Sequence, residues 1–160
     1  QTLSSVMKLR REQIYEYLEC LTQTYAISLL SQKSSIDNQV SSFDKVYFED
    51  VGFAQAVSSS ISAGQLLENA VFMNIRKHQL TYYQTRSGQE IDFIVEGSLG
   101  LEVKQTVSTH NLDATKKRAQ AAGVSDWAVV GDNPLHLQKV IFPWDVGSAV
   151  ASYVTETNKA

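Results

Sequence analysis

Residues 80–106, LTYYQTRSGQEIDFIVEGSLGLEVKQT, decide the fold that we expect for this chain. Aromatic and β-branched residues fill three short runs typical of strands, and small polar residues with glycine separate them. The runs are 80–85, 90–96 and 99–106, and the turn residues between them include Arg86-Ser87-Gly88 and Gly97-Ser98. Because the connections are short, we expect the three strands to pair as an antiparallel meander.

Helices and further strands are expected on the C-terminal side and directly before the meander. Apolar residues recur at helical spacing from Gly64 to His78, with Ser62 as the N-cap, and again from Asn111 to Ala122, where Gly123 ends the helix. The remaining predicted elements are strands at 127–130 and 137–142 and a closing helix at 148–155. The order helix, three strands, helix, two strands predicts an α/β fold.

The first forty-odd residues differ in character from this regular part. Apolar residues follow helical spacing from Ile14 to Tyr25 and then alternate to Leu29, so a predicted helix passes into a strand near Tyr25. A polar stretch at 31–44 predicts a loop or hairpin, and 45–48 and 53–57 predict a short strand and a helical turn. We therefore expect an N-terminal segment of helix and hairpin at 1–44 and a main domain at 45–160.

The amino-acid composition limits the classes of protein to which this chain can belong. With 160 residues, 43% hydrophobic and 19% charged, the chain suits one globular domain or a compact core with a smaller appended piece. A net charge of -3 gives no overall attraction to nucleic acid, so DNA binding would need a local basic patch or a basic partner. Cys20 is the single cysteine, and no apolar run is long enough to span a bilayer, which favours a soluble, cytoplasmic protein. Because it begins with Gln1, we expect a fragment of a longer polypeptide.

Three acidic residues and a lysine form the candidate site. Glu68 lies on the apolar stripe of its predicted helix, Asp92 lies on the middle strand, and Glu102 and Lys104 lie one residue apart on the third strand. Mg²⁺ prefers oxygen ligands, so two acids on neighbouring strands with a lysine beside them suit a metal site that cleaves phosphodiesters. The alternatives are a surface glutamate at the edge of the stripe, for Glu68, and ordinary ion pairs on a solvated strand face, for the other residues.

Strand alternation indicates how these side chains meet. It places Glu90, Asp92 and Ile94 on one face of their strand, and Glu102 and Lys104 together on one face of the next. The tight turn between the strands makes them neighbours, so Asp92 is expected to approach Glu102. Two close carboxylates repel unless a cation or a proton lies between them, and this pair therefore suggests a bound metal ion.

Five stretches carry a resemblance to a known family. They are Gly64-Gln-Leu-Leu-Glu68-Asn, Tyr82 to Phe93, Leu101-Glu102-Val-Lys104, Lys45 to Gly52 and Ile141-Phe-Pro143-Trp144. Together they resemble the PD-(D/E)xK nuclease superfamily and, more closely, the uncharacterised C-terminal nuclease-like domain of prokaryotic AAA-type ATPases. The resemblance implies a restriction-endonuclease-like core, a central mixed sheet flanked by helices, with a truncated winged-helix-like segment at the N-terminus.

The resemblance also implies roles for the residues. Asp92, Glu102 and the Val103 carbonyl would hold Mg²⁺, Glu68 would assist from the helix, and Lys104 would orient the attacking water. Glu90 would contact these ligands without binding the metal itself. The partner implied is an ATPase domain of the same polypeptide; the chain itself has no Gly-x-x-x-x-Gly-Lys-Ser/Thr loop.

Two alternatives remain beside a Mg²⁺-dependent nuclease. One is a non-catalytic module of the same fold that binds DNA or a protein for the ATPase. The other is a scaffold that oligomerises through the N-terminal helix. Two basic clusters bear on nucleic-acid binding: Lys8 with Arg10 and Arg11 suits a solvated helix face, and Lys116-Lys117-Arg118 is either a DNA-facing patch or another solvated face.

Overall fold

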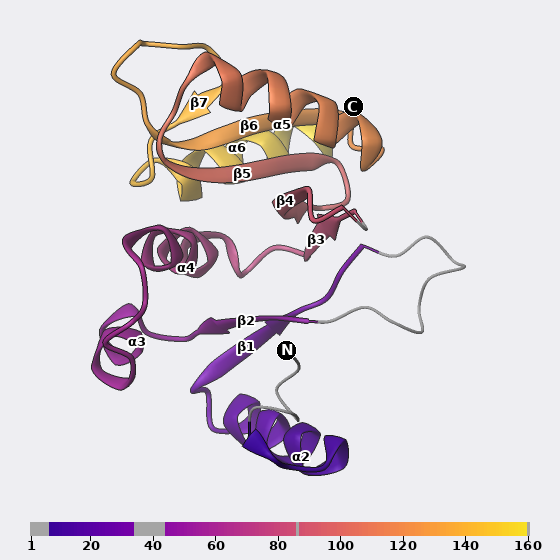
Figure 1. The fold of residues 1–160 in the computed structure, drawn as a ribbon. Helices are drawn as coiled ribbons and strands as arrows, with labels where there is room; N and C mark the ends of the chain where they lie inside the picture. The colour runs from indigo at the N-terminus through magenta and orange to yellow at the C-terminus, as the bar shows by residue number, and fades with distance from the viewer. Residues whose placement is uncertain (1–6, 34–43, 86, 160) are drawn as a thin grey trace.

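The structure is a computed structural model that describes residues 7–33, 44–85 and 87–159 (Figure 1). The first part contains α2 (Arg11–Gln23), β1 (Ile27–Leu30), β2 (Lys45–Phe48) and α3 (Val51–Val57). The second part contains α4 (Ala63–Ile75), β3 (Leu80–Gln84), β4 (Glu90–Val95), β5 (Leu99–Thr106), α5 (Thr109–Ala121), β6 (Asp126–Asp132), β7 (Val140–Ile141) and α6 (Val146–Thr157). No helix in the described ranges combines the length and the apolar character needed to cross a membrane.

A mixed sheet forms the centre of the second part, with the strand order β3-β4-β5-β6-β7. The first three strands pair antiparallel, which confirms the predicted meander, whereas β5, β6 and β7 pair parallel. A parallel pair needs a long crossover, and α5 supplies it between β5 and β6. The α/β class with a mixed sheet flanked by helices is thus confirmed.

The two faces of the sheet bury different side chains. The larger core contains the inward residues of α4 and α6, such as Phe72 and Val150, packed with Phe93, Leu101 and Val130 of the sheet. A smaller cluster on the opposite face contains Ile91 and Ile94, packed with Ala122 at the end of α5. Figure 1 shows α5 and α6 on opposite sides of β6, with α4 next to the β1–β2 hairpin.

Helix α4 begins as the sequence predicts. The side chain of Ser62 accepts a hydrogen bond from the backbone N–H of Gln65 at 3.2 Å, and the Gln65 side-chain oxygen accepts one from the Ser62 N–H at 2.8 Å. This capping box satisfies two amides that the first helical turn would leave unpaired. The helix ends at Ile75, three residues before the predicted end.

The last strand is shorter than the predicted 137–142. The side chain of Asn133 bonds the N–H of Leu137 at 2.8 Å and its carbonyl at 2.9 Å, which closes a turn over these residues. His136 and Lys139 have positive φ angles of 49° and 61°, outside the extended region. Only Val140 and Ile141 therefore pair with β6.

A β-bulge in β4 changes the predicted alternation. Thr81 pairs with Ile94 but Tyr83 pairs with Ile91, so β4 contains one extra residue at this point. The extra residue places Ile94 on the α5 face with Ile91, and the prediction that Ile94 shares a face with Asp92 is wrong. The bulge lies at Asp92 and Phe93, so it decides where the Asp92 carboxylate points.

The N-terminal part packs against this sheet through a hairpin. The predicted passage from helix to strand is confirmed: α2 ends at Gln23, Tyr25 turns the chain with a φ of 56°, and β1 follows. Strands β1 and β2 pair antiparallel, and Gln32 makes a parallel bridge to Tyr82 of β3. The boundary placed at 44/45 falls between the two strands of the hairpin; the division into two domains stays a prediction.

Candidate acid cluster and its basic residues

The ammonium of Lys45, the first residue of β2, lies among three carboxylates. Its Nζ is 2.9 Å from Glu68 Oε1 on α4, 2.7 Å from Glu90 Oε1 and 3.2 Å from Asp92 Oδ1 on β4. Glu68, Glu90 and Asp92 each offer one oxygen, and these oxygens lie within 4.8 Å of one another. We call these three residues the acid cluster. Among the described residues, the Lys45 ammonium is the only cation that pairs with all three carboxylates.

Glu68 faces inward, as predicted, and has two partners on β2. Besides the Lys45 contact, its Oε1 accepts a hydrogen bond from the Tyr47 hydroxyl at 2.7 Å. The Tyr47 ring is stacked on Phe72 at a centroid distance of 4.4 Å, one helical turn after Glu68. The alternation of β2 brings Lys45 and Tyr47 to the same face, so the hairpin meets α4 with both residues.

Asp92 is the most buried member of the acid cluster. The pairing of β4 with β5 ends at Phe93 and Leu101, and the Asp92 Oδ2 then takes the place of a backbone carbonyl by accepting the Val103 N–H at 2.7 Å. Burial raises the pKa of Asp92 to about 7; the charges of Glu68 and Glu102 also raise it, whereas Lys45 lowers it. Asp92 is therefore a carboxyl group that exchanges its proton near neutral pH.

The neighbouring groups have opposite tendencies. Burial acts to raise the pKa of Glu90, but the hydrogen bonds from Lys45 and Asp92 outweigh it and hold this pKa below its ordinary value. Burial acts to lower the pKa of Lys45, but the charges of Asp92 and Glu68 and the bonds to Glu90 and Glu68 outweigh it, so this pKa is raised. The ammonium thus keeps its charge, and Glu90 keeps its own.

Glu102 lies on β5 next to the acid cluster but has different partners. Its Oε1 is 2.7 Å from Lys104 Nζ and 2.7 Å from Arg118 Nη1, and Arg118 also reaches the Glu90 carbonyl at 3.5 Å. Glu102 is 3% exposed, and its Oε2 has no hydrogen-bond partner among the described residues. A buried carboxylate oxygen without a partner costs free energy, so this atom is a vacant acceptor inside the protein.

The structure thus distributes the predicted site residues over two adjoining groups. Glu68 and Asp92 belong to the acid cluster, whereas Glu102 and Lys104 form an ion pair beside it on the next strand. The two groups touch through the backbone, because Asp92 accepts the N–H of Val103. The role predicted for the Val103 carbonyl stays a prediction.

Three basic or polar residues were missed, and one prediction is wrong. Lys45 and Tyr47 had a signal, because strand alternation places both on one face of 45–48. Arg118 is predicted to lie with Lys116 and Lys117 on either a DNA-facing patch or a solvated helix face, but it points to the sheet and pairs with Glu102. Its signal is helical spacing, since the buried Thr115 precedes it by three residues.

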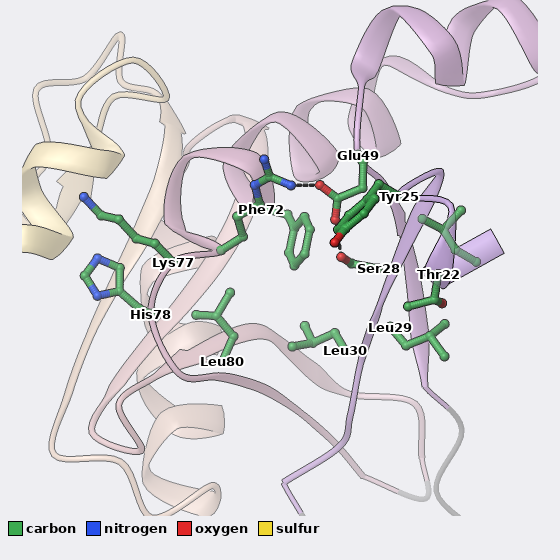
Figure 2. A pocket seen from close by; sticks show the side chains of 12 residues that line it. Thr22, Tyr25, Ser28, Leu29, Leu30, Glu49, Phe72, Lys77, His78 and Leu80 are labelled. Carbon is green, nitrogen blue, oxygen red and sulfur yellow. Dashed lines mark hydrogen bonds and ion pairs between the residues drawn. The ribbon is translucent and has the colours of Figure 1, made fainter. Parts of the chain in front are cut away.

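A pocket of about 570 Å³ is lined in part by Phe72 and shares no lining residue with the acid cluster. It opens between β1, the C-terminal end of α4 and the start of β3, with Leu30, Phe72 and Leu80 among its lining residues (Figure 2). Glu49 forms an ion pair with Arg76 and accepts a hydrogen bond from Ser28 at its edge. Further lining residues are Thr22, Tyr25, Ile27, Leu29, Lys77 and His78.

Comparison with known proteins identifies the family of the second part. Residues 63–145 match the family described as Domain of unknown function (DUF4143). Uncharacterized protein MJ1544 of Methanocaldococcus jannaschii is 31% identical over 119 residues, which cover 71% of this chain and 26% of the relative. The chain therefore spans about a quarter of that relative. No solved structure matches the chain.

The matched residues include both acidic groups but not the hairpin. Glu68, Asp92 and Glu102 lie within 63–145, whereas Lys45 lies before it. The cation at the centre of the acid cluster is therefore supplied by a segment outside the matched region. Because residues 63–145 make up more than half of the 160-residue chain, the chain belongs to the DUF4143 family.

Proposed function

We propose that the chain is a nuclease-like domain that hydrolyses phosphodiester bonds of nucleic acid with the help of Mg²⁺ or another divalent cation. The observation that carries the proposal is the pair of buried carboxyl groups on adjacent strands, Asp92 and Glu102, with Lys104 bonded to the second. The resemblance to PD-(D/E)xK nucleases supports the proposal, because it assigns metal binding to Asp92 and Glu102 and the attacking water to Lys104. The wider proposal is a restriction-endonuclease-like domain of a cytoplasmic ATPase whose other parts lie outside this chain.

The donor set fits a divalent ion of the Mg²⁺ type. All the candidate ligands are oxygen atoms, from carboxylates and from the Val103 carbonyl, and this ion prefers oxygen to nitrogen and sulfur. The vacant Oε2 of Glu102 needs a hydrogen-bond donor or a cation, and the oxygens of the acid cluster already surround one positive charge. Asp92 and Glu102 would hold the ion, with Glu68 assisting. When bound, it would neutralise charge on the phosphate and lower the pKa of a coordinated water.

The other residues of the site would act through charge and position. Lys104 is partly exposed, so its ammonium can reach both Glu102 and a substrate, where it would orient the attacking water and stabilise negative charge. Arg118 would fix the orientation of Glu102 from α5. Lys116 and Lys117 are exposed on the same helix and could contact a nucleic-acid backbone.

A combined binding and cleavage experiment tests the proposal. Calorimetric titration with Mg²⁺ and Mn²⁺ is followed by incubation with single- and double-stranded DNA and RNA. Asp92→Ala should lose both metal binding and cleavage, whereas Lys104→Ala should keep metal binding and lose cleavage. Lys139→Met is the control, because Lys139 pairs with Asp126 on the surface and should leave both unchanged. Absence of cleavage in the wild-type protein with each ion and substrate would refute the nuclease.

The second candidate is a non-catalytic module that binds a protein or DNA for the ATPase. Two observations favour it: the Lys45 ammonium already compensates the acid cluster, and the pocket beside Phe72 offers a separate place to bind a partner. In such a module the acids would hold the hairpin on the sheet. Replacing Asp92 would then change the stability of the protein in the same way with and without Mg²⁺. For a metal-binding site, added Mg²⁺ would stabilise the wild-type protein alone.

A further inference from the structure

The hairpin places a positive charge where the proposed site needs one. Lys45 is largely buried, with 19% of its side chain exposed, and its Nζ also lies 5.5 Å from the centre of the Tyr82 ring. A lysine ammonium has three N–H donors, and three carboxylates lie within 3.2 Å of it. Its bonding capacity is therefore filled by Glu68, Glu90 and Asp92.

This arrangement conflicts with the simultaneous presence of a divalent ion. An ion held by Asp92 and Glu68 would share their oxygens with the ammonium, and like charges at such short range repel strongly where water is excluded. Glu102 is buried on the next strand and its charge acts on Asp92, and its Oε2 has no hydrogen-bond partner among the described residues, so a further oxygen is available to a cation there. The Lys45 ammonium and a divalent ion therefore cannot occupy the acid cluster together, and one of them must leave it.

We propose that Lys45 is a tethered cation that occupies the acid cluster in the metal-free protein and must leave it when a divalent ion binds. The inference rests on the proposed function and adds a means of regulation to it. The hairpin that carries Lys45 would thereby couple metal occupancy to its own attachment. A change that separates β2 from α4 would favour metal binding, and a change that holds β2 against α4 would oppose metal binding.

The switch can be local because the hairpin has a second attachment. Tyr47 donates to Glu68 at 2.7 Å and stacks on Phe72, and neither contact involves the ammonium. Lys45 has a flexible four-carbon side chain and lies next to the described end of the hairpin. Its side chain can therefore swing to solvent while β2 stays docked through Tyr47.

The test compares the affinity for Mn²⁺ of three variants by calorimetry. Lys45→Met removes the competing charge and keeps much of the side-chain volume, so it should bind Mn²⁺ roughly 10- to 100-fold more tightly than the wild-type protein. Lys45→Arg keeps the charge and should show no such gain. Lys139→Met removes a surface charge elsewhere and controls for the change in net charge. Binding by Lys45→Met that is equal to or weaker than that of the wild type would overturn the inference.

A measurement on the unmodified protein covers the case in which Lys45→Met does not fold. The hydrogen-bonded Lys45 ammonium should give a slowly exchanging NMR signal, and saturating Mg²⁺ should abolish it or shift it to that of an exposed lysine. A signal that persists unchanged while the ion binds would overturn the inference. Tight metal binding by Lys45→Met, with no cleavage of nucleic acid by this variant or by the wild type, would refute the proposed nuclease and leave the inference about Lys45 intact.

Discussion

Gly131 of β6 is the position where one added methyl group should disturb the site most directly. A Cβ atom there would lie 2.1 Å from the backbone oxygen of Lys104 and 3.0 Å from a methyl group of Val107. The cause is the irregular register of β5, where Val103 pairs with Val130 but Thr106 pairs with Asp132. The backbone of Lys104 thus passes directly over Gly131, and Gly131→Ala must push it away.

The size of the effect follows from this distance. To reach the shortest tolerable separation of 3.0 Å from 2.1 Å, the Lys104 backbone must retreat by about 0.9 Å. Overpacking of this kind typically costs about 1–3 kcal/mol, so we expect Gly131→Ala to lower the free energy of unfolding by about 2 kcal/mol. In a chain of this size, that loss lowers Tm by roughly 4–8 °C. A catalytic group tolerates displacements of about 0.5 Å, so cleavage should fall further than the folded fraction does.

Gly147 provides the matched control. It lies in α6, and a Cβ there would be 3.5 Å from the Asn74 carbonyl oxygen, an ordinary contact. Gly147→Ala should therefore leave stability unchanged or raise it by about 0.5 kcal/mol. Urea denaturation, with equal m values for the compared proteins, measures both variants. Equal midpoints for Gly131→Ala and the wild type would refute the close approach of β5 to β6.

Three further predictions concern the site. Burial raises the pKa of Asp92 from 3.8 to about 7. The contribution of Asp92 to the stability of the folded protein is therefore complete below about pH 4 and is lost as the pH rises through about 7. In urea denaturation, Asp92→Asn should remove this pH dependence. Arg118→Met leaves the buried Glu102 with one partner fewer and should lower the free energy of unfolding by about 2–4 kcal/mol. A second substitution, Glu102→Gln, should partly restore stability. Full stability of Arg118→Met alone would contradict this prediction. Tyr47→Phe removes the 2.7 Å hydrogen bond to Glu68 and should cost about 1 kcal/mol in thermal unfolding, whereas no loss would mean that water replaces the hydroxyl.

Local patterns predicted most of the second part of the fold. The meander, the cap at Ser62 and the helix α5 all depend on residues that lie close together in sequence. The acids were found for the same reason, since Asp92 and Glu102 occupy consecutive strands joined by a tight turn. Local sequence therefore suffices to find carboxylates that share a region of the sheet.

The bulge at Asp92 could not be predicted in the same way. An extra residue in β4 shows in the sequence only as a break in alternation, and the run Ile91 to Val95 contains no polar residue besides Asp92 to mark it. The break becomes visible once the partners are known, because Ile91 and Ile94 pack together against α5. Register is a property of two strands, so one strand alone does not reveal it.

Sequence patterns indicate which way the basic residues face, but tertiary packing decides which carboxylates they meet. Lys45 is separated by 23 residues from Glu68 and by 47 from Asp92, and it reaches them because Tyr47 docks the hairpin on Phe72. A carboxylate series in a sequence indicates a site of high negative charge, but a metal, a proton or a lysine can each compensate that charge. Here a proton is available to Asp92 and an ammonium fills the centre. The chemistry of the site therefore depends on whether a divalent ion can displace Lys45 from the acid cluster. If it can, the site suits a metal-dependent enzyme; if it cannot, the same residues form a structural ion-pair network.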